Sequence, residues 1–398
     1  MLEARSRIWW NDITGPSRLV SAITSGLLSG KNVVVLVPED LPWRHDMRSA
    51  VENTLREEDC DLDIQYVDCK EENNFFSSNH TNIPEYLMSY ATPDIRNGFR
   101  TSGRYTIQQY LLDNQVLLNR VLWVKGMSHQ HAKDWLAFCK DYKAKNQYDG
   151  LFVIESYDDL PSRGLGNNVL FLRYEDYVTF YDALLFDNIL VSSLDLSIEW
   201  KKYIATVMAS LCCCDVQIAE SIIDNIDIHL SPIDALNSIF CSNEYEERSK
   251  ASNLTSSHPL NLIRSNKTEQ IEKKVWSAQL QILFPLIEVE RLALITRHSN
   301  DIMEALKTPY LNQKGIAVKV TQFGEIVTDP NKTELGTLHR LTCLRSAFDQ
   351  GQYLLFLPNE EDRCRLTLLH RMRNNIAHGI MCHENDVFDF LNKHPYKW

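Results

Sequence analysis

Nine residues near the C-terminus, RMRNNIAHG from Arg371 to Gly379, contain the residue types that metal-free phosphodiester chemistry needs. Cleaving RNA without a metal requires a base that takes the ribose 2′ proton and a cation that holds the phosphate. Histidine has a pKa near neutrality, and the planar arginine guanidinium matches phosphate geometry and stays charged. His378 is therefore the candidate base, and Arg373 is the candidate phosphate-binding residue.

A regular helix would place these side chains on different faces. Asn374 and His378 are four residues apart and share one face, with His370 one turn earlier and Arg371 beside them. Arg373 is displaced from His378 by about 140° around the helix axis. The pair can act together only if Arg373 reaches around the helix, or if the helix ends or bends before His378. The glycine that follows His378 favours an ending.

Arginine directly followed by asparagine, in an Arg-x4-His spacing near the end of a late helix, resembles the motif of HEPN domains. This superfamily includes metal-independent ribonucleases of toxins, antiviral systems and RNA-guided effectors. The resemblance covers residues 273–393 and implies a helical bundle in which Arg373 and His378 are catalytic and Asn374 orients them. Arg371 fits a looser form of the pattern. Because HEPN nucleases pair two motifs and this chain has one, the resemblance implies RNA as substrate and a homodimer or a second protein as partner.

The same residues also fit an ordinary helix end. Arginine and histidine in a last turn favour the negative end of the helix dipole, and Asn and Gly are common C-terminal signals. A further hypothesis is that Glu334 pairs with an arginine of the final helix and fixes the motif. An Arg373 buried in such a pair would be structural. Arg371, His370 and Glu334 are the candidate supporting residues of the motif.

The composition is that of a long globular chain with more acidic than basic residues. The 398 residues predict two or three domains, and the formal net charge of −12 argues against non-specific coating of nucleic acid. No apolar run reaches the length of a membrane span, and the N-terminus MLEARSRIWWND is polar, so we expect a cytoplasmic protein with no membrane contact. Ten scattered cysteines predict reduced thiols rather than a disulfide framework.

The first half of the chain alternates short apolar runs with helical patterns, which predicts a mainly parallel sheet covered by helices. The stretch from Lys70 to Arg104 is polar and is expected to be a surface insertion. The predicted strands are Asn32–Val37, Leu62–Val67, Val121–Val124, Leu151–Ile154 and Val169–Leu172.

The second half is predicted to be helical, so the fold class is α/β plus all-α. We expect an α/β domain over residues 1–195, a helical connector with a polar linker over 196–270, and a HEPN-like bundle over 271–398. Within the bundle, a long amphipathic helix over Lys273–His298 is expected to turn one set of side chains inward. That set is Trp276, Leu280, Leu283, Phe284, Ile287 and Leu294.

The N-terminal half weakly resembles a degenerate P-loop NTPase of the AAA or STAND type, without its nucleotide motifs. SGLLSGKN, residues 25–32, has the wrong glycine spacing and precedes a strand instead of following one. The loop PEDLPW after the first predicted strand has no glycine, and Lys125 stands where a metal-binding acid is expected. We therefore expect no nucleotide, no cofactor and no ATPase activity. His129 and His131 begin a predicted helix, where their side chains diverge, so no metal site is expected there.

Three functions remain open from the sequence. The first is a ribonuclease effector, in a toxin or a prokaryotic antiviral system, with a regulatory or partner-binding N-terminal domain. The second is a non-catalytic subunit of a multi-protein defence or DNA-processing complex. The third is a small-molecule enzyme at the carboxyl ends of the N-terminal strands, which only the fold class supports.

Overall fold

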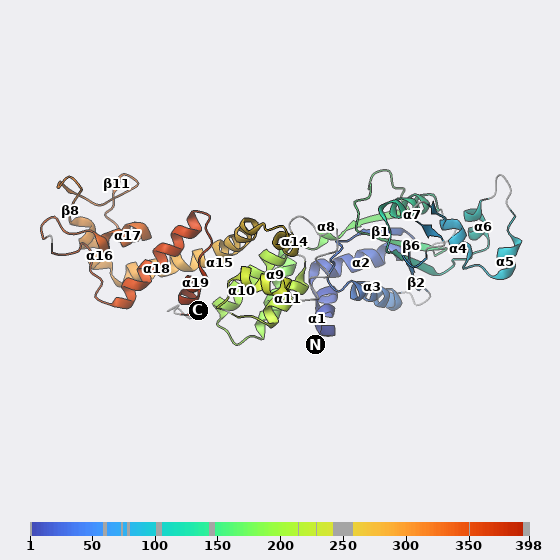
Figure 1. Ribbon diagram of the computed structural model, residues 1–398, viewed down its shortest axis with the longest axis horizontal. Coiled ribbons are helices and arrows are strands. Elements are labelled where there is room, and N and C mark those ends of the chain that lie inside the picture. The colour runs from blue at the N-terminus through green and yellow to red at the C-terminus, as the bar shows by residue number, and fades with distance from the viewer. Residues whose placement is uncertain are drawn as a thin grey trace. The chain divides into compact units, whose positions relative to one another are not determined.

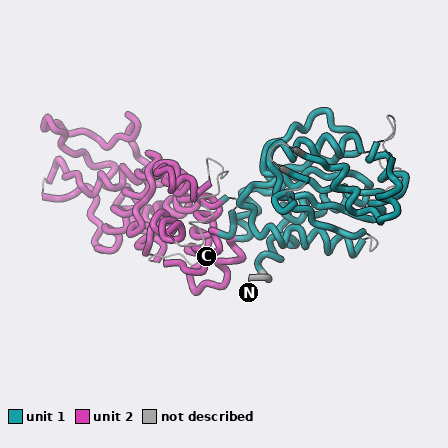
Figure 2. Tube along the Cα trace, turned by 45° about the vertical axis from the view of Figure 1, so that its right-hand side comes forward, with its two compact units in different colours: residues 1–186, 213–217, 250–255 teal, residues 187–212, 218–249, 256–398 magenta. Residues whose placement is uncertain are grey.

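The computed structural model describes residues 2–58, 62–72, 75–77, 80–100, 106–142, 148–213, 215–227, 229–241, 258–349 and 351–392. The chain forms two compact units (Figure 2). Unit 1 comprises residues 1–186, 213–217 and 250–255, and unit 2 comprises residues 187–212, 218–249 and 256–398. Among the described residues, no helix is both long enough and apolar enough to cross a membrane.

Unit 1 is built on a five-stranded parallel sheet with the strand order β2-β5-β6-β1-β7 (Figure 1). The sequence predicted all five strands, because each is a short run rich in apolar β-branched or aromatic residues between turn signals. The prediction of a parallel, helix-covered sheet is confirmed. The strands are β1 (Asn32–Leu36), β2 (Asp63–Asp68), β5 (Arg120–Lys125), β6 (Leu151–Ser156) and β7 (Val169–Arg173).

Helices cover both faces of this sheet, so alternate residues of one strand meet different layers. On one face, α4 (Ile83–Met88), α6 (Ile107–Asp113) and α7 (His129–Asp141) enclose a core that contains Phe152 and Trp135. On the other face lie α2 (Thr14–Leu28) and α3 (Arg44–Glu58) (Figure 1). Gly26 of α2 lets that helix approach Val33, because a Cβ there would come within 3.0 Å of the valine side chain.

The expectation of a surface insertion from Lys70 to Arg104 is wrong for much of that stretch. Phe76, Leu87 and Ala91 are buried and belong to the core beside α7, although the polar residues between them hid this in the sequence. Residues 73–74, 78–79 and 101–104 of the stretch lie outside the described residues. The other elements of the N-terminal half are α1 (Leu2–Arg7), the π-helix η1 (Ile8–Asp12), β3 (Phe76–Ser77), β4 (His80–Thr81), α5 (Pro93–Gly98), α8 (Tyr174–Tyr177) and α9 (Phe180–Ser192).

Unit 2 is mainly helical and centres on α15 (Thr268–Arg297), which packs against α10 (Ile198–Cys212) and α18 (Glu360–Ala377). Because α10 lies along α15, most of the expected connector over 196–270 belongs to unit 2, and the chain divides into two units rather than three segments. Residues 242–257 of the expected linker lie outside the described part of the chain. The remaining elements of the C-terminal half are α11 (Val216–Asp224), α12 (Pro232–Phe240), α14 (Pro259–Arg264), α16 (Ser299–Lys307), β8 (Tyr310–Leu311), β9 (Ala317–Val318), β10 (Thr321–Gln322), β11 (Glu325–Ile326), η2 (Pro330–Lys332), α17 (Leu335–Cys343) and α19 (Glu384–Asn392).

The inward face of α15 differs from the predicted set. Leu283, Ile287 and Leu294 are buried as expected, whereas Leu280 is exposed. Two polar residues, Gln279 and Glu290, are buried instead. Both have hydrogen-bond partners from distant parts of the chain, and a helical pattern of apolar residues cannot indicate such partners.

Candidate functional site

Helix α18 ends cleanly at the sequence motif. It runs to Ala377, with exposed His378 as the C-cap and Gly379 at a φ of 75°. The N–H of Gly379 bonds to the carbonyl of Ile376, and the N–H of Ile380 bonds to the carbonyl of Asn375 at 2.8 Å. This is a Schellman ending, which needs a left-handed residue at the glycine position. The predicted helix end is therefore confirmed.

Two residues of α15 hold the backbone around this ending. Trp276 donates its indole N–H to the carbonyl of Ile376 at 2.8 Å. Gln279 accepts the backbone N–H of Cys382 at 2.7 Å and donates to the Cys382 carbonyl and to the Tyr203 hydroxyl. Neither role was predicted from the sequence. A glutamine on the apolar face of α15 was the one available signal.

Arg373 turns away from His378 and joins a row of polar side chains, which we call the motif chain: Glu334, Arg373, Asn374 and His370. The Arg373 guanidinium lies 3.6 Å from the carboxylate of Glu334, the N-cap residue of α17. It also donates to Asn374 Oδ1 at 3.4 Å, and Asn374 Nδ2 lies 3.0 Å from His370 Nε2. The pairing hypothesised from the sequence, between Glu334 and an arginine of the motif helix, is thus present for Arg373 of α18.

His370 ends the motif chain as a neutral base. Burial lowers its pKa, and His339 and the Arg373 charge lower it further. An amide nitrogen can only donate, so Asn374 requires His370 Nε2 to be an acceptor and places the proton on Nδ1. His339 of α17 stacks on the His370 ring, with centroids 4.4 Å apart and planes 14° apart. His339 was not predicted to lie here, because it stands 31 positions before His370 in the sequence.

The other two candidate residues lie apart from the motif chain. Arg371 pairs with Asp386 of α19, with Arg371 Nε 2.8 Å from the carboxylate. His378 is exposed, and its imidazole forms no hydrogen bond or ion pair with any residue that the structure describes. The structure therefore brings together Glu334, His370, Arg373 and Asn374, but it does not bring His378 of the same chain into contact with them.

A groove of about 780 Å³ lies along the first half of α18. Of the motif residues, Arg371 lines it, and Arg373, Asn374 and His378 do not. Arg297 pairs with Asp362 and Arg365 with the buried carboxylate of Glu290, whereas Arg363 donates to backbone carbonyls. The lining contains as many carboxylates as arginines, so the groove offers little net attraction to a phosphate.

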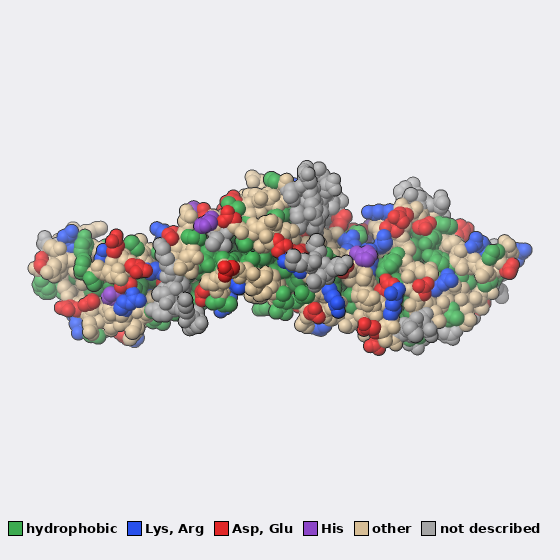
Figure 3. All heavy atoms as spheres, turned by 90° about the horizontal axis from the view of Figure 1, so that it is seen from below, with side chains coloured by type: hydrophobic (Ala, Val, Ile, Leu, Met, Phe, Trp, Pro, Cys, Tyr) green, Lys and Arg blue, Asp and Glu red, His purple; other side chains and the backbone are tan. Residues whose placement is uncertain are grey.

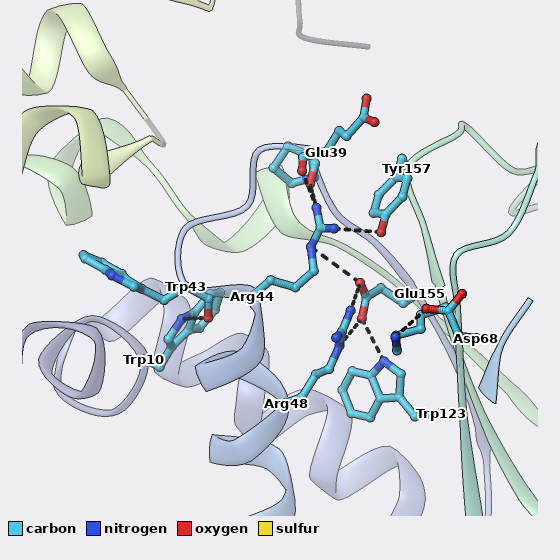
Figure 4. Close-up of polar contacts among 11 residues, drawn as sticks. Trp10, Glu39, Trp43, Arg44, Arg48, Asp68, Trp123, Glu155 and Tyr157 are labelled. Carbon is cyan, nitrogen blue, oxygen red and sulfur yellow. Dashed lines mark hydrogen bonds and ion pairs between the residues drawn. The ribbon is translucent and has the colours of Figure 1, made fainter. Parts of the chain in front are cut away.

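In unit 1 the carboxyl ends of the strands are the expected place for a ligand, because open α/β sheets bind ligands there. At the end of β6, the buried carboxylate of Glu155 accepts two hydrogen bonds from Arg48, at 2.8 and 2.6 Å (Figure 4). It also accepts the indole N–H of Trp123 at 2.8 Å, and Arg44 Nε lies 3.7 Å away. The Glu155 carboxylate therefore occupies the position at which Arg48 and Arg44 could otherwise bind an anionic ligand.

The neighbouring polar side chains at the carboxyl end of the sheet also have partners within unit 1. Arg44 donates to the Tyr157 hydroxyl at 2.8 Å and to the carbonyls of Pro38 and Glu39 in the PEDLPW loop (Figure 4). Lys125 at the end of β5 lies 2.6 Å from Asp68 at the end of β2. Burial alone would raise the pKa of Asp68, but the hydrogen bonds from Lys125 and from the Lys70 backbone outweigh it and lower the pKa.

The two histidines at the start of α7 point to different surroundings. His129 is exposed and lies 3.6 Å from Asp158, whereas His131 is buried against the ring of Phe76. The helical spacing predicted that the two side chains would not share a face, and they do not.

Comparison with known proteins adds no family to this picture. No family model matches the chain, and a search of curated proteins finds no match either.

Proposed function

We propose that unit 2 is a HEPN-like bundle and carries a metal-independent ribonuclease site formed by Arg373, Asn374 and His378. The motif chain is the observation that supports this most directly. It holds a half-exposed guanidinium and an oriented amide beside a neutral imidazole, at the end of a helix whose C-cap is an exposed histidine. These groups supply a phosphate-binding cation and a titratable base without a metal.

In this proposal, His378 takes the proton from the ribose 2′ hydroxyl, and the 2′ oxygen attacks the adjacent phosphorus. Arg373 binds the phosphate oxygens as their charge increases. The 5′ oxygen leaves with a proton from a second histidine, which yields a 2′,3′-cyclic phosphate and a 5′ hydroxyl. His378 lies apart from Arg373 within one chain, so the reacting pair is completed by the motif of a second copy.

A cellular role as a toxin or antiviral effector follows from this activity, because RNA cleavage would stop growth of the host. Unit 1 would then regulate the site or bind a partner protein without a nucleotide. On the face of the molecule drawn in Figure 3, basic and acidic side chains are interspersed, and the coloured residues form no broad basic patch. Recognition of RNA would therefore be local to the motif rather than spread over this face.

The second candidate is a non-catalytic subunit of a multi-protein complex. The observation that favours it is the carboxyl end of the sheet in unit 1, where Glu155 is hydrogen-bonded by Arg48 and lies 3.7 Å from Arg44. A unit that retains the sheet but fills its own ligand position can still serve as a docking module.

One experiment separates the two candidates. The wild type, Arg373→Ala and His378→Ala are compared for host growth arrest and for cleavage of total RNA in the presence of EDTA. His383→Ala is the matched control, because His383 is an exposed histidine nearby that lies outside the proposed site. EDTA-resistant cleavage that both site variants lose and the control keeps supports the ribonuclease. Folded variants with unchanged biological activity and no RNA cleavage by the wild type support the docking subunit.

A further inference from the structure

The β10–β11 hairpin of unit 2 presents an aromatic side chain in an unusual backbone conformation. Thr321 pairs with Ile326 and Gln322 with Glu325, which leaves Phe323 and Gly324 as a two-residue turn. Both turn residues have positive φ, 51° for Phe323 and 85° for Gly324. This pattern is a type I′ turn, whose first central position favours Asn, Asp or Gly. A bulky side chain there is strained.

Packing of the Phe323 ring against the described residues does not offset this strain. The side chain is 84% exposed, and no described aromatic ring or cation contacts it. Trp43 also has positive φ, but its ring packs against Phe186 at a centroid distance of 5.7 Å. Phe323 therefore combines backbone strain with exposed apolar surface, and strain that local packing does not explain points to a function.

The hairpin is fixed directly beside the motif chain. The Gln322 side chain accepts the backbone N–H of Glu334 at 3.0 Å and donates to the carbonyl of Lys332 at 3.1 Å. Glu334 in turn lies 3.6 Å from Arg373. On the other side, Arg340 of α17 donates to the carbonyl of Thr321. Phe323 at the tip therefore follows directly after Gln322 in the sequence. The Gln322 side chain bonds to the backbone of Glu334, and Glu334 contacts the proposed phosphate-binding Arg373.

We propose that Phe323 is a base-stacking residue, which holds an unpaired RNA base next to the phosphodiester bound at Arg373. The inference rests on the proposed ribonuclease function. Single-stranded nucleic acids are bound by aromatic side chains that stack on bases, set beside cations that meet the backbone. Phe323, with Arg340, Lys332 and Arg373 on adjoining segments, has this composition. The short, anchored hairpin also fixes the ring before binding, so little ordering is needed.

The test measures binding of a fluorescein-labelled single-stranded oligoribonucleotide by anisotropy, with EDTA present. Binding is measured in a His378→Ala background so that the RNA stays intact, and cleavage is measured in the parent. Phe323→Ala should weaken binding by about 5- to 150-fold, the range expected for one base stacked on an aromatic ring. Phe323→Trp should preserve binding. Phe348→Ala is the matched control, because Phe348 is equally exposed, at 83%, and lies outside the hairpin.

Two more variants separate stacking from other roles. Phe323→Leu keeps an apolar tip but removes the ring, and it should bind as weakly as Phe323→Ala. Phe323→Asn suits the left-handed turn, so it should raise the melting temperature by about 2 °C while it weakens RNA binding. Full RNA affinity in Phe323→Leu would show that binding does not need the aromatic ring and would overturn stacking.

The outcomes also distinguish the inference from the function on which it rests. If the parent cleaves RNA and Phe323→Ala binds and cleaves normally, the stacking role is wrong and the ribonuclease stands. If the parent neither binds nor cleaves RNA, both proposals fail.

Discussion

Replacing Arg48 with methionine is expected to destabilise unit 1 strongly, because the change leaves a carboxylate buried without its main partner. The Glu155 side chain is fully buried, and Arg48 is its only bidentate donor among the described residues. Removing one member of such a buried pair commonly costs 3–5 kcal/mol. Arg44 remains 3.7 Å from the carboxylate and can compensate in part, so we expect about 3 kcal/mol.

The reverse change, Glu155→Met, should cost a similar amount, about 3 kcal/mol, since it leaves Arg48 and the Trp123 N–H without an acceptor. The double variant removes both charges and leaves mainly the indole N–H unpaired, for about 2 kcal/mol. The sum of the single losses is then larger than the double loss by about 4 kcal/mol. Such a coupling energy would show that the two residues stabilise unit 1 as one unit.

Hydrogen exchange measured by mass spectrometry on peptides from β5 and β6 reports this quantity for unit 1 alone, within the full chain. The most protected amides of these two strands give the unfolding free energy for each variant. Glu52→Met in the wild-type background is a matched control, because Glu52 of α3 pairs with exposed Arg56 and accepts a 3.3 Å hydrogen bond from the partly exposed Tyr66 hydroxyl. Losses that add to within about 0.5 kcal/mol would refute the argument.

Three further predictions concern unit 2. Glu334→Ala and Arg373→Ala should each shift the melting temperature little and should couple by less than about 1 kcal/mol, since their ion pair is partly exposed at 3.6 Å. Gln279→Ala should lower the unfolding free energy in urea by about 2 kcal/mol, because it leaves the buried backbone of Cys382 without partners. The folded-state pKa of His370 is lowered, so the unfolded chain binds its proton more readily, and stability should fall as pH drops below about 6.5. Melting curves of His370→Gln should show a smaller fall over the same pH range.

Sequence patterns were most informative where structure is local. The strands of unit 1 are short runs rich in apolar residues, and the end of α18 depends on Gly379 and its neighbours, so both were predicted. The order of strands in the sheet was not predicted, because it depends on how the connecting helices cover each face. Phe76 and Leu87 were assigned to a surface insertion because the stretch from Lys70 to Arg104 is rich in Asn, Ser and charged residues, although both side chains are buried.

The residues of the candidate sites were harder to predict, because their partners are distant. Glu155 meets Arg48 across 107 residues, and Gln279 meets Cys382 across 103. No periodic pattern in a sequence can indicate contacts between residues so far apart. Glu334 was identified as a partner for an arginine of the last helix, but the stacking of His339 on His370 required the packing of α17 against α18.

The contrast between Arg48 and Arg373 bears on which arginine is available to a ligand. Arg48 is 12% exposed and makes two short hydrogen bonds to a buried carboxylate, so releasing it would cost several kcal/mol. Arg373 is 30% exposed, lies 3.6 Å from a half-exposed carboxylate, and donates one long hydrogen bond to Asn374. Exposed pairs of this kind contribute about 0–1 kcal/mol, whereas charge-assisted hydrogen bonds to a phosphate are stronger and can be bidentate. Arg373 can therefore exchange Glu334 for a phosphate at little cost, whereas Arg48 is held in place by the structure of unit 1.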